Sequence, residues 1–160
     1  MKAISNSLTY FFLILLLSGC ERSTVFHSYQ TFTADGWKKN AEITFHPDTL
    51  QENSICKVSI ELRNKANYPY RDIWLVVSQN AENTKNIVSD TLHYNLLDSR
   101  GYYKGKGIGD MYEISFPYKT ILFRKGIKTT FKIKHIMTDK YIYGINDIGI
   151  KIVYDEKHQF

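Results

Sequence analysis

The sequence predicts an all-β protein, built as a single antiparallel β-sandwich of about eight strands of the immunoglobulin-like or jelly-roll-like kind. Two observations predict this fold class. Apolar and polar residues alternate with a period of two in most segments, and clusters of Gly, Asn, Asp and Pro separate those segments. No window has the periodicity of an amphipathic helix, and aromatic residues, which favour strands, make up 14% of the chain.

The first segment is a signal rather than part of the fold. Lys2 precedes an apolar run of ten residues, 8–17, which at about 1.5 Å per residue is too short to cross a hydrocarbon core of about 30 Å. The run ends in Leu-Ser-Gly-Cys, which resembles a bacterial lipobox. We therefore expect a lipoprotein signal peptide at 1–19, an acylated Cys20 with a short tether at 20–27, and the sandwich at 28–160. The alternative is an ordinary secreted protein in which Cys20 is incidental.

The residues after Cys20 bear on the membrane face. They read Glu-Arg-Ser-Thr, a poor fit to the acidic cluster that often follows the cysteine of surface-exported lipoproteins. We expect a lipid anchor in the outer membrane, with the protein facing the periplasm rather than the cell surface.

Alternation places the expected strands along the rest of the chain. In 55–64, Cys56 shares one face with Val58, Ile60 and Leu62, so this thiol is expected to be a buried small hydrophobe that forms no disulfide. Segment 72–79 is apolar on both faces, which is typical of a central strand, and Trp74 is expected in the core. The remaining expected strands are 24–32, 41–45, 90–97, 111–116, 130–137 and 147–156, with 120–123 as a possible ninth.

The stretch YYKGKGIGDMY, residues 102–112, has glycines at alternate positions around a lysine, as phosphate-binding loops do. Such loops lead from a strand into a helix N-terminus. Here the residues that follow alternate as a strand, and no Gly-Lys-Ser/Thr pattern follows. Segment 98–110 is therefore expected to connect two strands of a hairpin, and no nucleotide is expected to bind.

Other patterns that would indicate chemistry are missing. The five histidines show no metal-ligand spacing, the carboxylates are scattered, and no nucleophile elbow is present. Removal of Lys2 with the signal lowers the formal charge from +5 to +4, without a basic block, which argues against nucleic acid. We expect no catalytic residues, no metal, no cofactor and no small-molecule substrate.

Aromatic and basic residues in turns are the candidates for contact with a partner, because such groups on rigid loops are common interface anchors. Packing within the fold is the alternative for each, and it is the favoured one for Trp37 and for the tyrosines of the 102–106 loop. The candidates are Trp37, Tyr68, Tyr70, Tyr102, Tyr103 and Lys106.

Four stretches together resemble the gliding-motility lipoprotein GldH family of Bacteroidota: Gly36-Trp37, RNKANYPYRDIWLVV at 63–77, DTLHYNLLDSRGYYKGKGIGDMYE at 90–113 and GINDIGIKIVYD at 144–155. With the lipobox, the resemblance spans the chain. It departs at 124–128, where RKGIK replaces a proline-containing turn.

The resemblance implies a non-enzymatic outer-membrane lipoprotein, an accessory or assembly component of the gliding machinery that is linked to type IX secretion. Its partners would be envelope proteins of that machinery. The alternative is a carbohydrate-binding envelope lipoprotein that stacks sugars on exposed Trp and Tyr. A glycan- or peptide-cleaving enzyme is a third possibility for which no carboxylate stands out.

Overall fold

A computed structural model describes residues 24–81 and 87–156, and this part of the chain contains eleven strands and no α-helix. The fold class predicted from the sequence is confirmed. In chain order the strands are β1 (Thr24–Thr31), β2 (Trp37–Lys38), β3 (Ile43–Phe45), β4 (Ser54–Lys65), β5 (Asp72–Ala81), β6 (Val88–Asn95), β7 (Lys106–Ile108), β8 (Met111–Phe123), β9 (Thr129–His135), β10 (Tyr141–Ile142) and β11 (Ile145–Tyr154).

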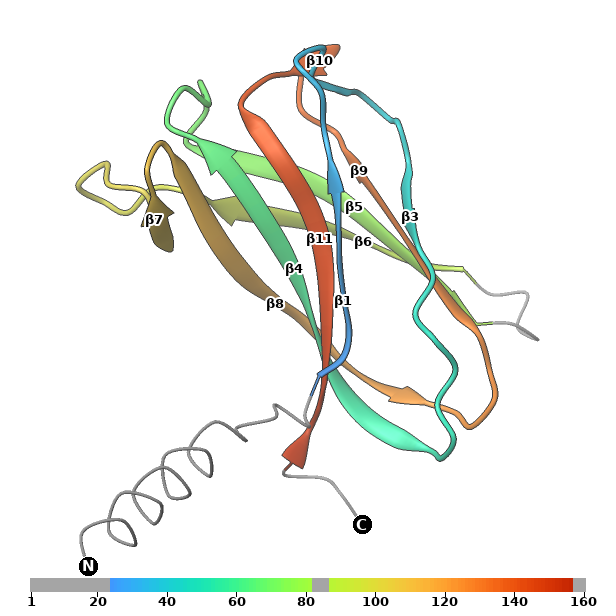
Figure 1. The fold of residues 1–160 in the computed structure, drawn as a ribbon. Helices are drawn as coiled ribbons and strands as arrows, with labels where there is room; N and C mark the ends of the chain where they lie inside the picture. The colour runs from blue at the N-terminus through green and yellow to red at the C-terminus, as the bar shows by residue number, and fades with distance from the viewer. Residues whose placement is uncertain (1–23, 82–86, 157–160) are drawn as a thin grey trace, which may run out of the picture.

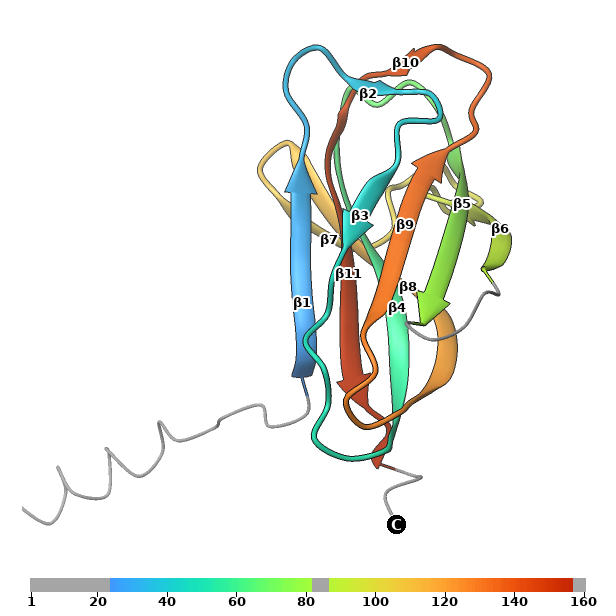
Figure 2. The same ribbon diagram turned by 90° about the vertical axis from the view of Figure 1, so that its right-hand side faces the viewer.

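The strands form two packed sheets and a small cap (Figures 1 and 2). The larger sheet has the order β1-β11-β4-β8-β7, and the four-stranded sheet has the order β3-β9-β5-β6. Strands β2 and β10 form a two-stranded ribbon at one end of the sandwich, the end opposite the start of β1. All pairings are antiparallel, as we expected.

The core lies between the two sheets and is filled by alternate residues of their central strands. Ile60 of β4 pairs with Ile150 of β11, and both are fully buried. Their neighbours on the same face are apolar as well, which is the alternation that the sequence shows. The inward residues of the three central strands are Val58, Ile60, Leu62, Ile73, Leu75, Val77, Ile148, Ile150 and Ile152.

Two strands that the sequence predicts separately form a single strand in the structure. Segments 111–116 and 120–123 belong to the continuous strand β8, which pairs with β4 along its whole length. Pro117 lies opposite Ser59, beside a register shift at which β8 has one extra residue between Pro117 and Lys119. A bulge is a place where a strand tolerates proline, because no ladder hydrogen bond is needed from its nitrogen.

Trp74 is not in the core, contrary to our expectation. Ile73, Leu75 and Val77 point inward, so the side chain between them points outward and is 41% exposed. Its ring stacks on that of His93 of the neighbouring strand, with ring centroids 4.2 Å apart.

The expected signal peptide and Cys20 lie outside the described residues, and so does the start of the expected tether. Strand β1 begins at Thr24, within the range that we expected to be tether. No helix of the described chain is long and apolar enough to cross a membrane.

Candidate functional site

The two most distinctive stretches of the sequence meet at one end of the sandwich. The loop between β6 and β8 folds over the turn between β4 and β5, and the Tyr103 hydroxyl donates a hydrogen bond to the carbonyl oxygen of Ala66 at 3.1 Å. The same hydroxyl lies 3.4 Å from the carbonyl oxygen of Tyr68. The Tyr103 ring stacks on Tyr112 of β8, with centroids 4.3 Å apart. Tyr103 therefore fixes the loop to both neighbours.

The Tyr-Pro-Tyr turn is held from inside the sandwich. Tyr68 is 4% exposed, donates its hydroxyl proton to the Asp72 carbonyl oxygen at 3.0 Å, and has its pKa raised by burial. Tyr70 packs edge-on against Tyr68 and donates to the Asp139 carboxylate, which raises the pKa of Tyr70. Gly144 lies so close that a Cβ there would be 2.7 Å from the Tyr68 Cα.

The glycines of the loop allow close backbone approach rather than phosphate binding. Gly105 has φ +96°, and a Cβ at this position would lie 2.2 Å from the carbonyl oxygen of Glu113. Only glycine fits such a contact in this conformation. It places Lys106, exposed at the start of β7, directly opposite Glu113 of β8. The loop leads into strands, and the described residues hold no helix at which a phosphate loop could end. The predicted hairpin between the flanking strands is wrong, because β6 and β8 belong to different sheets and do not pair. The segment crosses from one sheet to the other, and only its last part, β7, forms a hairpin with β8.

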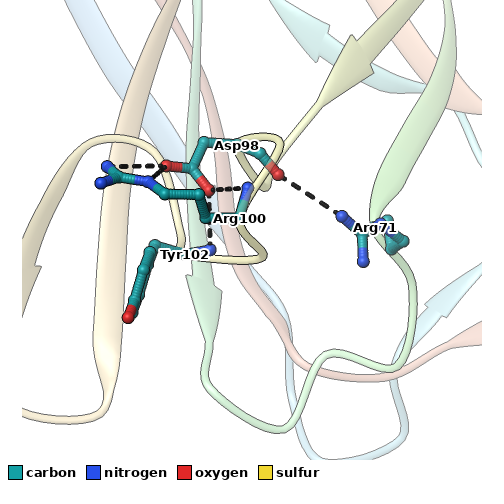
Figure 3. Close-up of polar contacts among 4 residues, drawn as sticks. All are labelled: Arg71, Asp98, Arg100 and Tyr102. Carbon is teal, nitrogen blue, oxygen red and sulfur yellow. Dashed lines mark hydrogen bonds and ion pairs between the residues drawn. The ribbon is translucent and has the colours of Figure 1, made fainter.

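The tip of the loop is a turn organised by Asp98 (Figure 3). Its carboxylate accepts hydrogen bonds from the backbone N–H groups of Arg100 at 2.8 Å and Tyr102 at 3.0 Å. These bonds, that of Tyr102 first, lower the pKa of Asp98. The Arg71 guanidinium reaches the Asp98 carbonyl oxygen at 3.4 Å, which joins the tip to the start of β5.

The tip presents Tyr102 to solvent on this ordered turn. Its side chain is 67% exposed, and the Arg100 guanidinium lies 5.4 Å from the ring centroid. Lys104 and Lys106 beside it are exposed too. The result is an aromatic and basic surface, formed by Arg100, Tyr102, Lys104 and Lys106, which we call the loop surface.

Two of the six candidate contact residues are unavailable to a partner. Trp37 is 1% exposed, and its indole N–H donates to the Ala41 carbonyl oxygen at 3.3 Å. Its ring stacks on Phe32 and meets His135 edge-on, so it closes the core beneath the β2-β10 ribbon. Trp37 thus packs, the alternative that we favoured, and Tyr68 packs as well. Burial excludes both side chains as contacts with a partner. It also leaves no exposed Trp37 ring on which a sugar could stack.

His93 and His135 do not meet, because β5 separates their strands. His135 is fully buried, and burial lowers its pKa, which favours the neutral ring. Its Nε2–H donates to the Trp37 carbonyl oxygen at 3.0 Å. Each histidine packs against a tryptophan, His93 on Trp74 and His135 on Trp37.

A polar cluster on the outer face of the larger sheet was not foreseen. Glu61 points outward from β4 yet is 3% exposed, and it accepts hydrogen bonds from Ser59 at 2.6 Å and Ser115 at 2.7 Å. The Arg63 guanidinium lies 4.0 Å over the Tyr29 ring and binds Glu113 at 2.7 Å. The cluster ties β1, β4 and β8 together.

The one sequence signal for this cluster is Gly149, in the middle of β11. A Cβ at Gly149 would lie 2.7 Å from the ring of Tyr29. A glycine inside a strand often marks such a close approach. Burial raises the pKa of Tyr29 to about 12.

No group of three or more His, Cys, Asp and Glu side chains is arranged to hold a metal ion anywhere in 24–81 and 87–156. Cys56 is fully buried, and burial raises the pKa of its thiol to about 11, opposite to what a nucleophile requires.

The fold and the site define a β-sandwich that carries an ordered aromatic and basic surface on loops at one end. A family model described as GldH lipoprotein matches residues 24–152. The chain belongs to the GldH lipoprotein family of gliding motility, and the resemblance seen in the sequence is confirmed.

Two relatives align along nearly their whole length. The chain is 26% identical over 160 residues to a gliding motility lipoprotein GldH homolog of Christiangramia forsetii, covering 95% of this chain and 97% of the relative. It is 28% identical over 156 residues to the gliding motility lipoprotein GldH of Flavobacterium johnsoniae, covering 93% and 96%.

Solved structures are only distantly similar. The Eiger TNF of S. frugiperda aligns with a TM-score of 0.39 and 7% identity over 87% of this chain and 100% of that one. A structure of infectious bursal disease virus aligns with a TM-score of 0.30 and 11% identity over 86% and 34%. Neither similarity carries an argument about function.

Proposed function

We propose that this GldH-family lipoprotein is a non-enzymatic accessory or assembly component of the gliding-motility machinery, acting by protein–protein contact. Acylated Cys20 anchors it in the outer membrane, facing the periplasm, beside components of the type IX secretion system. Family membership supports the link to gliding motility. The lipobox and the residues after it support the anchor and its face.

The observation that carries the contact mechanism is the loop surface. Hydrogen bonds to the Asp98 carboxylate and from the Tyr103 hydroxyl order the loop, so little conformational entropy is lost on binding. An exposed tyrosine flanked by cations is the kind of group that anchors protein interfaces. Tyr70, which packs on Tyr68 and binds Asp139, is a further candidate contact outside this surface.

The test removes the loop surface without unfolding the loop. Tyr102, Lys104 and Lys106 are changed together to alanine in the full-length lipoprotein, and Tyr103 is left because it fixes the loop to its neighbours. Crosslinked envelopes are then probed for proteins of the gliding and type IX machinery. We expect their recovery to fall, together with secretion through that system.

The control removes two exposed cations from the turn after β8, by Arg124→Ala and Lys128→Ala. We expect this variant to recover partners as the unaltered protein does. If the loop variant is also unaffected in both recovery and secretion, the loop surface is not the contact site.

A further inference from the structure

We propose that the free edge of β6 accepts an extended segment of a partner protein, which adds a fifth strand to the β3-β9-β5-β6 sheet. The proposal deepens the contact mechanism above and rests on it for the identity of the partner as an envelope protein. The edge of β6 is separate from the loop surface. A partner would bind this edge through main-chain hydrogen bonds as well as through side chains.

Strand β6 forms one margin of its sheet (Figure 2). It pairs with β5 over eight successive residues without any register shift. Within the described chain, β6 pairs with no strand except β5. Its other edge therefore carries a row of backbone groups that are available for pairing.

The hydrogen bonds of Trp74 show which residues of β6 point to the free edge. Trp74 N–H donates to Met137 Sδ at 3.3 Å, and Trp74 C=O accepts from Ile136 N–H at 3.0 Å, so both groups point away from β6. Trp74 lies opposite His93, and this pair is therefore the non-hydrogen-bonded kind. The backbone groups of His93 face the free edge, and alternation gives Thr91 the same orientation.

The other sheet margins carry the usual protections against strand addition. Strands β3 and β7 are each three residues long. Strand β1 has a register shift near its start. The part of β8 that extends past β7 contains Pro117 and a bulge. By comparison β6 is long and regular, and it contains neither proline nor lysine.

The one charged residue of β6 is Asp90, and an inward-pointing charge can protect an edge, but this charge is already paired. Asp90 points toward the interior, where its carboxylate binds the Tyr118 hydroxyl at 2.5 Å and the Lys119 ammonium at 2.5 Å. These contacts, that of Lys119 first, lower the pKa of Asp90, so the acid is ionised and paired. The strand is thereby tied to β8 of the other sheet.

Exposed apolar side chains flank the same strand. Ile87 is 66% exposed and Val88 43%, and Trp74 stands at the other end, stacked on His93. A segment rich in β-branched or aromatic residues on the face beside Trp74 matches these neighbours, because cross-strand pairs of that kind stabilise sheets. The occupant is therefore an extended apolar segment rather than a helix or a sugar.

A second copy of this chain fits less well than a different protein. Antiparallel pairing of β6 with itself reverses one sandwich relative to the other, so the two β1 strands start at opposite ends of the joined sheet. Only three residues lie between Cys20 and Thr24, so the two are separated by at most about 14 Å of extended chain. Both anchors reach one bilayer only if both sandwiches lie on their sides.

The test changes Thr91 to proline in the full-length lipoprotein. The Thr91 N–H faces the free edge, so Thr91→Pro leaves the β5 ladder intact and blocks the incoming strand. Thr91→Val is the matched control, because it keeps the backbone donor and a β-branched side chain. A photoreactive p-benzoylphenylalanine at Ser89 reports the contact in intact envelopes, and the same probe at Thr44 on the opposite margin reports background.

We expect crosslinks from position 89 to map to one short segment of one envelope protein, with few from position 44. Thr91→Pro should lower their yield about tenfold, the equivalent of one or two lost backbone hydrogen bonds, and Thr91→Val should not. A Thr91→Pro protein that melts as the unaltered protein does and crosslinks equally well overturns the proposal. If Thr91→Pro does not fold, the proposal is tested by comparing the crosslink yields of the probes at positions 89 and 44 in the protein with Thr91 unchanged.

Two further outcomes also overturn the proposal. Crosslinks that join position 89 to a second copy of this chain assign the edge to self-association, and equal crosslinking from positions 89 and 44 assigns it to no partner. Either result leaves the proposed function standing if the alanine variant of the loop surface still loses its partners. If neither the alanine variant of the loop surface nor Thr91→Pro loses contact with a partner, the contact mechanism itself is refuted.

Discussion

Replacing Tyr103 by phenylalanine tests whether one hydroxyl orders the loop surface. The hydroxyl is the donor to the Ala66 carbonyl oxygen, whereas the ring stack on Tyr112 does not need it. A typical intramolecular hydrogen bond contributes about 1 kcal/mol to stability. We therefore expect Tyr103→Phe to lower the free energy of unfolding by about 1 kcal/mol and the melting temperature by roughly 4 °C.

The local effect is more diagnostic than the global one. If the loop detaches before the sandwich unfolds, the same 1 kcal/mol accelerates amide exchange in 98–110 by about fivefold. Hydrogen–deuterium exchange of the intact protein measures this rate peptide by peptide. Exchange in β4 and β11 should not change under conditions that favour the folded state.

The neighbouring Tyr102 provides the control. Its side chain is largely exposed, so Tyr102→Phe should change stability by less than about 0.5 kcal/mol and leave exchange in the loop unaltered. Equal exchange in Tyr103→Phe and Tyr102→Phe would refute the idea that Tyr103 fixes the loop.

Four further predictions concern single residues of the sandwich. Trp37→Ala should destabilise the fold by about 3–5 kcal/mol in denaturant unfolding, as expected of a core residue; a loss below 1 kcal/mol contradicts that role. Gly144→Ala should lower stability by more than about 1 kcal/mol, from left-handed strain and the contact with Tyr68; an unchanged melting temperature refutes it. Because burial raises the pKa of Cys56 in the folded protein, the thiol ionises at lower pH in the unfolded chain. The free energy of unfolding should therefore fall above about pH 9, and denaturant unfolding should show a smaller fall in Cys56→Ala. The lowered pKa of Asp90 makes its contribution present at neutral pH and lost as pH falls through that pKa; Asp90→Asn should show a smaller acid loss, and an equal loss contradicts the pairing.

The alternation of residues predicted the long strands other than β5, because a half-buried strand must place apolar side chains at every second position. Trp74 shows the limit of that reasoning. Strand β5 is apolar on both faces, and alternation alone does not tell which face is inward. Pro117 shows another limit, because a proline after an alternating run signals the end of a strand unless a bulge in that strand accommodates it, as the one in β8 does.

The site was only partly accessible from the sequence. The residue types of the loop surface could be identified as aromatic and basic groups among glycines. The bond between Tyr103 and Ala66 joins residues 37 positions apart, and it depends on strand order, which local patterns do not encode. The burial of Trp37 also depends on the β2-β10 ribbon, whose two-residue strands are too short to show any period.

The central claim is that an anchored lipoprotein contacts the gliding and secretion machinery. Crosslinked recovery of the full-length protein from intact envelopes, beside a Cys20→Ala version, tests it most directly. We predict that proteins of the gliding or type IX machinery are recovered with the cysteine present and not with alanine in its place. Recovery of polysaccharide-handling proteins only, or of the same proteins from both versions, would contradict the claim.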